Sequence, residues 1–300
     1  MKAVREKVEL PEGHSFRVLR WSRSLSEVEC ILGPGRTRPM QGEGAHWHFH
    51  KEMELTLFTE GEGTRFVGDA IGSFSAGDLV LLGERLPHHW HTQGGSAGLS
   101  IQWHFPESHP LWAFPENLEL RSLFRRAERG VRIGGPTAKV VAGMMQEVAR
   151  SRGAGQLAAL LRLLAEVSEA PDSDLSTLAT RSFTRSAESE HQSAISRSVQ
   201  HLVANFRDEV RLGDLLRISG LSRPTFARQF KRHSGRSFSA FVNQLRLQAA
   251  RRELRDGDRS VLDVALACGF RQVTFFNRLF RRELGCTPTE YRRRQRRRGR

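Results

Sequence analysis

The stretch Val264-Ala265-Leu266-Ala267-Cys268-Gly269-Phe270-Arg271 decides the fold of the C-terminal part of this chain. It repeats the earlier stretch Leu215-Leu216-Arg217-Ile218-Ser219-Gly220-Leu221-Ser222, with the glycines 49 positions apart. In each copy an apolar segment leads to a glycine, and a second segment with helical periodicity follows. A tight turn between crossed helices places one residue at positive φ, where glycine has little steric cost. Each copy therefore predicts a helix-turn-helix unit.

The second helix of each unit has one apolar and one polar face. Phe226 and Phe230, like Phe276 and Phe280, are four residues apart and are predicted to point into the core. Arginines on the opposite face can donate two hydrogen bonds to guanine, and side chains near the helix ends more often meet phosphate. The predicted DNA-contacting residues are Ser222, Arg223, Arg228, Lys231, Arg271, Gln272, Thr274, Arg278 and Arg281.

A longer helical period lies between the two units and ends at Asp256-Gly257-Asp258. A rigid connecting helix would hold the two reading helices at a fixed separation. Since one turn of B-DNA is about 34 Å, the two helices could enter successive major grooves on one face of the duplex.

The positive charge is confined to the second half of the chain. The net charge is +14, residues 1–170 contribute zero, and residues 171–300 hold 27 Lys and Arg against 13 Asp and Glu. Such a basic domain beside a neutral one favours double-stranded DNA as the partner of the basic domain. The last residues, 293–300, are predicted to be an arginine-rich tail.

Residues 194–292 resemble the DNA-binding domain of AraC/XylS-type transcription regulators. The resemblance rests most specifically on a motif that consists of Asp263-Val264-Ala265, Gly269-Phe270, Phe276, Arg278, Phe280, Gly285, Thr287-Pro288 and Tyr291-Arg292. The first unit departs from the family, because Leu216 replaces the usual alanine and Pro224 lies in the reading helix. Base recognition by that unit is therefore expected to be weak. The resemblance implies a homodimer and contact with RNA polymerase.

The N-terminal part contains short alternating strands separated by Gly and Pro, which are typical of an all-β barrel or sandwich. Its segment Gly42-x5-His48-x-His50-x3-Glu54-x6-Gly61 is similar to the first cupin motif, and Gly77-Asp78 with Pro87-His88 is similar to a weaker second motif. His48, His50, Glu54 and His88 would suit a divalent metal. The same groups, with Trp103 as a stacking surface, could instead bind a sugar-like effector without metal. Both occupants remain open, and no cofactor is predicted to be required.

After Pro115 the period becomes helical, and from Ser168 to about Ser193 the chain is polar. The predicted domains are therefore a cupin-like effector and dimerisation domain (1–168), a linker (169–193), a double helix-turn-helix domain (194–292) and the tail (293–300). The predicted fold class is a β-barrel with trailing helices followed by an all-α domain.

Several function classes find no support in the sequence. There is no Walker A loop, no GxGxxG after a strand, no HExxH and no GxSxG. No apolar run approaches the roughly 18 residues of a membrane helix, and the charged N-terminus lacks the apolar run of a signal peptide. We therefore expect a cytoplasmic, ligand-responsive DNA-binding regulator that is not an enzyme and has no membrane partner. The alternatives are a metal-sensing regulator and a metal-dependent cupin enzyme fused to a DNA-binding module.

Overall fold

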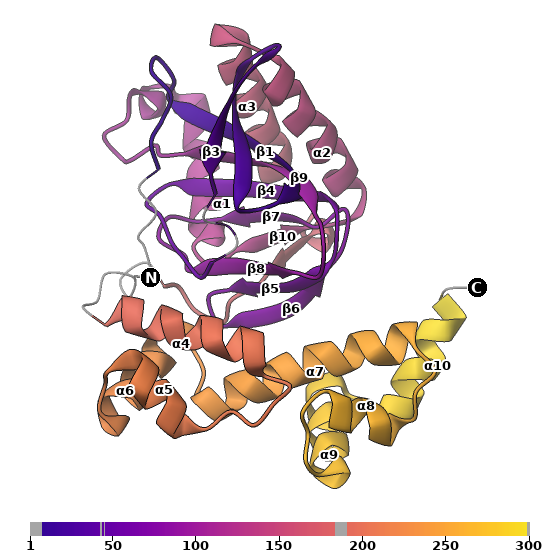
Figure 1. The fold of residues 1–300 in the computed structure, drawn as a ribbon. Helices are drawn as coiled ribbons and strands as arrows, with labels where there is room; N and C mark the ends of the chain where they lie inside the picture. The colour runs from indigo at the N-terminus through magenta and orange to yellow at the C-terminus, as the bar shows by residue number, and fades with distance from the viewer. Residues whose placement is uncertain (1–7, 43, 45, 184–190, 299–300) are drawn as a thin grey trace. The chain divides into compact units, whose positions relative to one another are not determined.

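The computed structural model describes residues 8–42, 44, 46–183 and 191–298. The chain divides into two compact units between Ser193 and Ala194. Every strand found in the described residues belongs to the first unit, and the second unit consists of helices and their connections (Figure 1).

The N-terminal unit is built on two antiparallel sheets. The larger has the strand order β11-β10-β7-β4-β9-β1-β2-β3 and the smaller β6-β5-β8. The strands are β1 (Phe16–Ser24), β2 (Glu27–Gly33), β3 (Arg36–Gln41), β4 (Met53–Glu60), β5 (Gly63–Val67), β6 (Ala70–Phe74), β7 (Leu79–Leu82), β8 (His88–Thr92), β9 (Ala97–Trp103), β10 (Val131–Ile133) and β11 (Leu175–Thr177).

The central strands of the larger sheet, β4, β7 and β9, are buried on both faces, because they are apolar at successive positions. In β7, Leu79 and Leu81 belong to a core cluster shared with the helices, whereas Val80 and Leu82 belong to a second cluster shared with the smaller sheet. This follows from the two-residue period of a strand. The second cluster therefore fills the space between the two sheets, and the candidate pocket described below lies on that side.

Helices cover the outer face of the larger sheet. The three helices of this layer pack through apolar side chains such as Leu123, Met145 and Leu160, and α2 and α3 lie together along the sheet in Figure 1. The helices are α1 (Leu120–Ala127), α2 (Gly135–Arg150) and α3 (Gly153–Ser168), with 3₁₀ turns at Pro110–Ala113, Pro115–Glu119 and Asp172–Asp174.

Much of the predicted linker, residues 169–193, belongs instead to the N-terminal unit. Strand β11 pairs with β10, and the side chains of Ala179 and Phe183 are buried in the cluster between the sheets. A few apolar side chains in a polar stretch were enough to anchor it, and composition alone did not reveal them. Residues 184–190 of the predicted linker lie outside the described residues.

The C-terminal unit contains both predicted helix-turn-helix units. The first is formed by α5 and α6 and the second by α8 and α9, with α7 connecting them. This confirms the predicted fold class of a strand-rich domain followed by a double helix-turn-helix domain, whereas the cupin classification of the first domain stays a prediction. The helices are α4 (Gln192–Asn205), α5 (Leu212–Ser219), α6 (Arg223–Ser234), α7 (Phe238–Asp256), α8 (Val261–Ala267), α9 (Val273–Leu284) and α10 (Pro288–Arg298).

The predicted arginine-rich tail is mostly helical. Helix α10 continues to Arg298, and the ring of Tyr291 lies against Phe280 with the ring centroids 5.6 Å apart. Arg292 donates a hydrogen bond to the backbone carbonyl of Arg259. Arginine is a good helix former, so a run of arginines next to a packed aromatic side chain extends the helix. Of the tail, only residues 299–300 lie outside the described residues.

Among the helices that the structure describes, none combines the length and the apolar character needed to cross a lipid bilayer.

Candidate nucleic-acid interface and histidine pocket

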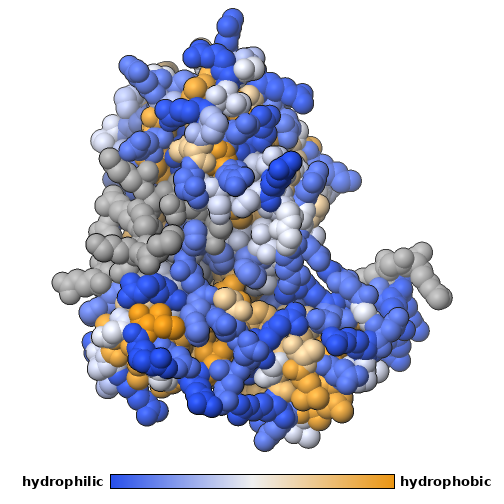
Figure 2. All heavy atoms as spheres, in the orientation of Figure 1, coloured by the Kyte–Doolittle hydropathy of each residue, from blue (hydrophilic) through white to orange (hydrophobic). Residues whose placement is uncertain are grey.

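The reading helices α6 and α9 bury their aromatic residues and expose their basic ones. Phe226, Phe230, Phe276 and Phe280 are all 0% exposed. All predicted DNA-contacting side chains are solvent-exposed, namely Ser222, Arg223, Arg228, Lys231, Arg271, Gln272, Thr274, Arg278 and Arg281. Each unit therefore presents a polar face with cationic side chains, backed by an apolar core. Hydrophilic side chains dominate the visible face of this domain, apart from apolar patches over α5 and over α8 and α9 (Figure 2).

The central arginines of these faces are not neutralised by acidic neighbours. Neither Arg228 nor Arg278 forms an ion pair with a described acidic residue, and the guanidinium of Arg278 lies 5.8 Å from the ring centroid of Phe275. A guanidinium that is exposed and without a carboxylate partner keeps its donors available for a base edge or a phosphate.

Arg271 is in a different situation, because it shares a carboxylate with Arg211. Nη2 of Arg271 lies 2.8 Å from Oε1 of Glu209, and Nη2 of Arg211 lies 3.1 Å from Oε2. Hydrogen bonds from these two guanidinium groups lower the pKa of Glu209, so the carboxylate is ionised at neutral pH. Glu209 therefore neutralises part of the positive charge of Arg271, one of the predicted DNA-contacting residues.

The turns of the two units differ in how much space surrounds the glycine. Gly220 has φ +69° with open space around it, whereas Gly269 has φ +87° and faces the backbone carbonyls of Phe206 and Arg207. Arg246 fixes the loop that carries these two carbonyls, because its Nε donates to the carbonyl oxygen of Phe206 at 2.8 Å. The second turn therefore requires glycine for two reasons, its backbone angle and the close approach of a neighbouring loop.

In the N-terminal unit, three histidines meet around one point. The side chains of His48, His50 and His88 are buried, and one nitrogen of each lies within 4.8 Å of the others. A backbone bridge pairs His48 with His88, which brings together two segments that are 40 residues apart in the sequence.

Backbone carbonyls fix the orientation of all three rings. The Nδ1 atoms of His48, His50 and His88 lie 2.7, 2.9 and 2.7 Å from the carbonyl oxygens of His46, Glu52 and Leu86. Because a carbonyl oxygen can only accept, each Nδ1 carries a proton, and Nε2 is the ring nitrogen that could bind a metal. In His50 this nitrogen lies 2.9 Å from Oε2 of Glu54, so a metal ion would have to replace that hydrogen bond. This arrangement is typical of histidines that bind a metal through Nε2.

Glu54 completes the cluster and carries the negative charge. Its Oε2 lies 2.9 Å from Nε2 of His50 and 3.8 Å from Nε2 of His88. Burial alone would raise the pKa of Glu54, but the hydrogen bond with His50 and the charges of His88 and His50 hold it well below its ordinary value. Burial and the charge of His48 lower the pKa of His88. Among the described groups, Nε2 of His88 has no hydrogen-bond partner.

A polar row across three neighbouring strands supports Glu54. Gln102 lies opposite both Arg17 and Glu54 in the sheet register. Its amide nitrogen donates to Glu54 at 2.6 Å, and its amide oxygen accepts from Nε of Arg17 at 2.6 Å. Thr56 donates a further hydrogen bond to Glu54. These contacts fix the carboxylate at the point where the histidines meet.

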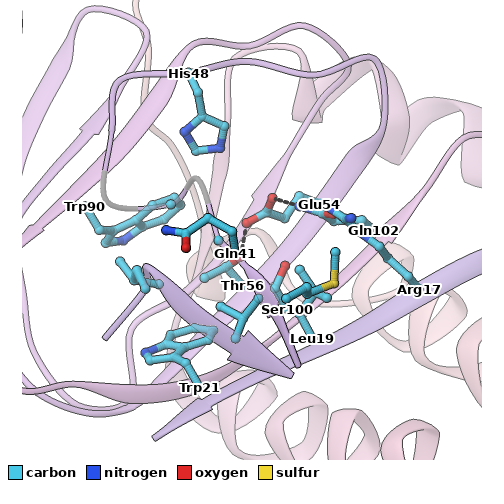
Figure 3. A pocket seen from close by; sticks show the side chains of 15 residues that line it. Arg17, Leu19, Trp21, Gln41, His48, Glu54, Thr56, Trp90, Ser100 and Gln102 are labelled. Atoms are coloured by element: carbon cyan, nitrogen blue, oxygen red, sulfur yellow. Dashed lines mark hydrogen bonds between the residues drawn. The ribbon is translucent and has the colours of Figure 1, made fainter. Parts of the chain in front are cut away.

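A cavity of about 40 Å³ lies beside this cluster. Its wall includes His48 and Glu54 but not His50 or His88, and Figure 3 shows His48, Trp90, Trp21, Glu54 and Gln102 around it. The volume holds an ion with a few water molecules, whereas sites for drug-sized ligands usually measure several hundred Å³.

Residues 215–294 match the family model described as a helix-turn-helix domain. The transcriptional activator RhaS of Enterobacter sp. (strain 638) is 41% identical over 88 residues, which are 29% of this chain and 32% of that protein. RhaS of Pectobacterium carotovorum is 27% identical over 264 residues, which are 82% of this chain and 86% of that protein. The chain spans only about a third of the length of those relatives that are 33–41% identical to it.

Two solved structures align with the C-terminal domain. One is the DNA-binding domain of AdpA, a global transcriptional factor, in complex with a target DNA. It is 30% identical, and the alignment covers 35% of this chain and 95% of that chain, with a TM-score of 0.34. The other is a transcriptional regulator from Chromobacterium violaceum, described as AraC-type DNA-binding domain-containing. It is also 30% identical, and the alignment covers 35% of this chain and 93% of that chain, with a TM-score of 0.33. The C-terminal domain is thus a helix-turn-helix domain that is similar to those of the RhaS activators.

The predicted AraC-type resemblance is thus confirmed. The described structure places the predicted DNA-contacting residues of this AraC-type domain on the exposed side of its reading helices, but their individual contacts with DNA stay predictions. Sequence analysis missed the ion pair between Glu209 and Arg271, because Glu209 lies 62 positions before Arg271 in the sequence and only the fold brings them together.

In the N-terminal domain, the histidine prediction and the tryptophan prediction have different outcomes. His48, His50, Glu54 and His88 come together, although their ligand stays a prediction. Trp103, predicted as an effector contact, was misplaced: it is 0% exposed in the cluster between sheet and helices, since it points to the opposite face of β9 from Gln102.

The motifs did not predict several other residues around the pocket, although polar residues at every second position of apolar strands were a usable signal. These pocket-lining residues are Arg17, Trp21, Thr56, Ser100 and Gln102.

Proposed function

We propose that this chain is a transcription regulator that binds specific double-stranded DNA and responds to a small ligand in its N-terminal domain. The observation that carries the proposal is the pair of exposed reading faces, with Arg228 on α6 and Arg278 on α9, each backed by buried phenylalanines. The AdpA complex and the RhaS activators support it, because they are relatives of the same domain.

Selection of duplexes from a random library, followed by fluorescence anisotropy, tests the DNA half. We expect the selected duplex to bind about a thousand-fold or more tightly than a random duplex at the same salt concentration, as specific regulators do. Equal affinities would contradict sequence-specific regulation. A homodimer and contact with RNA polymerase extend the proposal, and sedimentation of the full chain with and without DNA checks the dimer.

For the ligand, the described pocket favours a divalent cation over a sugar. The residues fit a metal: each Nδ1 is held by a carbonyl oxygen, Nε2 of His88 is buried without a partner among the described groups, and the carboxylate of Glu54 supplies negative charge. His48, His50, His88 and Glu54 would hold the ion, which would act as a Lewis-acidic centre of fixed charge. A sugar ring would need more volume than the cavity provides, so the cavity would have to widen.

The cation proposal predicts one high-affinity zinc site per chain. Calorimetric titration of EDTA-treated protein with Zn²⁺ should give one site, and Zn²⁺ at a hundred times its Kd should stabilise the folded state by about 2.7 kcal/mol. His50→Ala and His88→Ala should remove both effects, whereas His104→Ala should not, because His104 pairs with Glu84 instead. A panel of monosaccharides in the same thermal-shift assay tests the sugar-like effector, and stabilisation by a sugar but not by zinc would reverse the preference.

The alternative of a metal-dependent enzyme receives no support from the relatives, which are transcription regulators. An activity assay of the full chain loaded with zinc or iron tests this alternative. Measurable turnover that is lost in Glu54→Gln would contradict the proposal that the chain is a regulator without catalytic activity.

A further inference from the structure

The end of the N-terminal domain is fastened by hydrogen bonds just before residues 184–190. Asp69, which lies between β5 and β6, accepts hydrogen bonds from the backbone nitrogen of Thr180 at 2.8 Å and from its hydroxyl. The backbone nitrogen of Ala179 donates to the carbonyl of Arg129 at 2.8 Å, and Nε of Arg129 donates back to the carbonyl of Ala179 at 2.9 Å. Asp69 is only 6% exposed, so this contact is part of the domain interior.

Phe183 directly precedes residues 184–190 in the sequence, and it is almost fully buried. It is 1% exposed, in the core cluster between the two sheets. Its ring packs on Gly68: a Cβ at that glycine would lie only 2.6 Å from Cε2 of Phe183. Asp69 and Phe183 therefore hold the segment 178–183 against the β5–β6 turn from two sides. We call these two contacts the anchor.

The anchor lies directly behind one of the pocket histidines. The backbone nitrogen of Gly68 donates to the carbonyl of Pro87 at 2.8 Å, and Val67 is paired with His88 in the sheet register. The core cluster that contains Phe183 also contains Trp90, which lines the pocket. Gly68 and Pro87 therefore connect the ring of Phe183 to the histidine cluster. Gly68 contacts the ring and donates to Pro87, and Pro87 directly precedes His88 in the sequence.

We infer that the anchor couples the histidine pocket to the segment that leads into the AraC-type domain: occupancy of the pocket tightens the His48–His88 bridge, and through Gly68 it holds Phe183 and Thr180 in place. This inference rests on the proposed ligand response. A close-packed core transmits a shift in one wall to its neighbours, and such a link acts in both directions, because coupling between two sites is reciprocal.

The first arm of the test uses Zn²⁺ as the probe and hydrogen exchange of the full chain as the readout. In wild-type protein, saturating Zn²⁺ should slow exchange of the amides of residues 178–180 by about tenfold, as expected for suppression of local opening. In His48→Ala the same Zn²⁺ concentration should leave these amides unchanged. If one zinc binds per chain and the exchange rates stay within twofold of the metal-free rates, the inference is wrong although the metal site stands.

The second arm requires no ligand, so it tests the coupling between the anchor and the pocket even if zinc does not bind. Phe183→Ala should speed exchange at the amide of His88, which donates to the carbonyl of His48 at 2.9 Å, by about tenfold. Phe183→Leu, which keeps most of the apolar volume, serves if the alanine variant does not fold. Asp69→Ala should act in the same direction.

Asp172→Ala is the matched control, since Asp172 also lies in this part of the chain but pairs with Arg126 at the surface. It should leave exchange at His88 unchanged. Unchanged exchange at His88 in folded Phe183→Ala and Phe183→Leu proteins would overturn the inference, whatever the pocket binds. If the wild-type protein does not bind zinc but the Phe183→Ala variant still exchanges faster at His88, the metal proposal is contradicted and the coupling remains supported.

Discussion

The carboxylate of Glu209 lies 2.8 Å from a guanidinium nitrogen of Arg271 and 3.1 Å from one of Arg211. Arg271 immediately precedes Gln272, the N-cap of the second reading helix. An acidic side chain thus pairs with two cationic groups close to the start of α9, where the sequence predicts contacts with DNA.

Replacing Glu209 by Gln should therefore strengthen binding to all duplexes. The variant frees two guanidinium groups, and we expect affinity to rise about threefold at low salt, the scale of an exposed ion pair. The slope of log K against log salt should steepen by about one to two. Anisotropy titrations at several salt concentrations measure both. Asp172→Asn changes the net charge equally in the other domain and should have no effect, and unchanged affinity in Glu209→Gln would show that Arg271 does not meet phosphate.

Arg278→Ala should lower affinity for the selected duplex and relax sequence preference. Its guanidinium is exposed on α9 without a described acidic partner, so a lost contact with guanine would cost about 1–3 kcal/mol. Competition with single-base variants of the selected duplex measures the effect. The control is Arg255→Ala, because Arg255 pairs with Asp256 near the end of α7. A uniform loss for every duplex would assign Arg278 to phosphate instead.

Neutralising the exposed arginines of α10 should weaken all DNA equally. Arg293, Arg294 and Arg297 are exposed, and glutamine keeps the helix because its helix propensity is close to that of arginine. The triple change to Gln should flatten the salt slope by about one to two without altering sequence preference. Substitution is a cleaner test than truncation, since α10 packs on the domain through Tyr291. An altered sequence preference would contradict this assignment.

Alanine should be tolerated less well at Gly269 than at Gly220. Both positions carry a positive φ, which costs a non-glycine residue about 1–2 kcal/mol. Only at Gly269 would the new Cβ also lie 2.6 Å from the carbonyl oxygen of Arg207, and relief of that clash should add about 1–3 kcal/mol. Urea unfolding of the full chain, followed in the helical signal, compares the two variants. An equal loss of unfolding free energy in the two variants would mean that the loop at 206–207 can move away from the new Cβ without a measurable loss of stability.

Gln102→Leu should destabilise the N-terminal domain and weaken its ligand site. The change leaves Nε of Arg17 without its amide partner and removes a donor from the buried carboxylate of Glu54, a loss of about 1–3 kcal/mol. Thermal unfolding and zinc titration report the two effects. Gln93→Leu, at an exposed position, should stay within about 0.5 kcal/mol of wild type. Wild-type stability of Gln102→Leu would contradict the role of the polar row.

Most of the C-terminal domain could be predicted from the sequence because its signals are local. Phe226 and Phe230, or Phe276 and Phe280, are four positions apart, and that spacing places both on one face of any helix that forms there. The glycine turns, the connecting helix and the exposed arginines follow from the same periodicity. The sequence could not show that Glu209 neutralises Arg271, because a loop and a turn distant in the chain meet only after folding.

In the N-terminal domain the sequence determined which residue types are available, and the tertiary structure decided which of them share a site. His48, His50, Glu54 and His88 were recognisable by their motif spacing. The register of β1, β9 and β4 placed Gln102 beside Glu54 and turned Trp103 to the helices, since neighbouring residues of a strand face opposite sides. Likewise, Phe183 lies in a polar stretch of the sequence. The packing of its ring on Gly68, together with the pairing of β11 with β10 and the hydrogen bonds between Thr180 and Asp69, made that stretch part of the domain. Local periodicity is a property of the chain itself, whereas register and packing depend on partners that only the folded structure supplies.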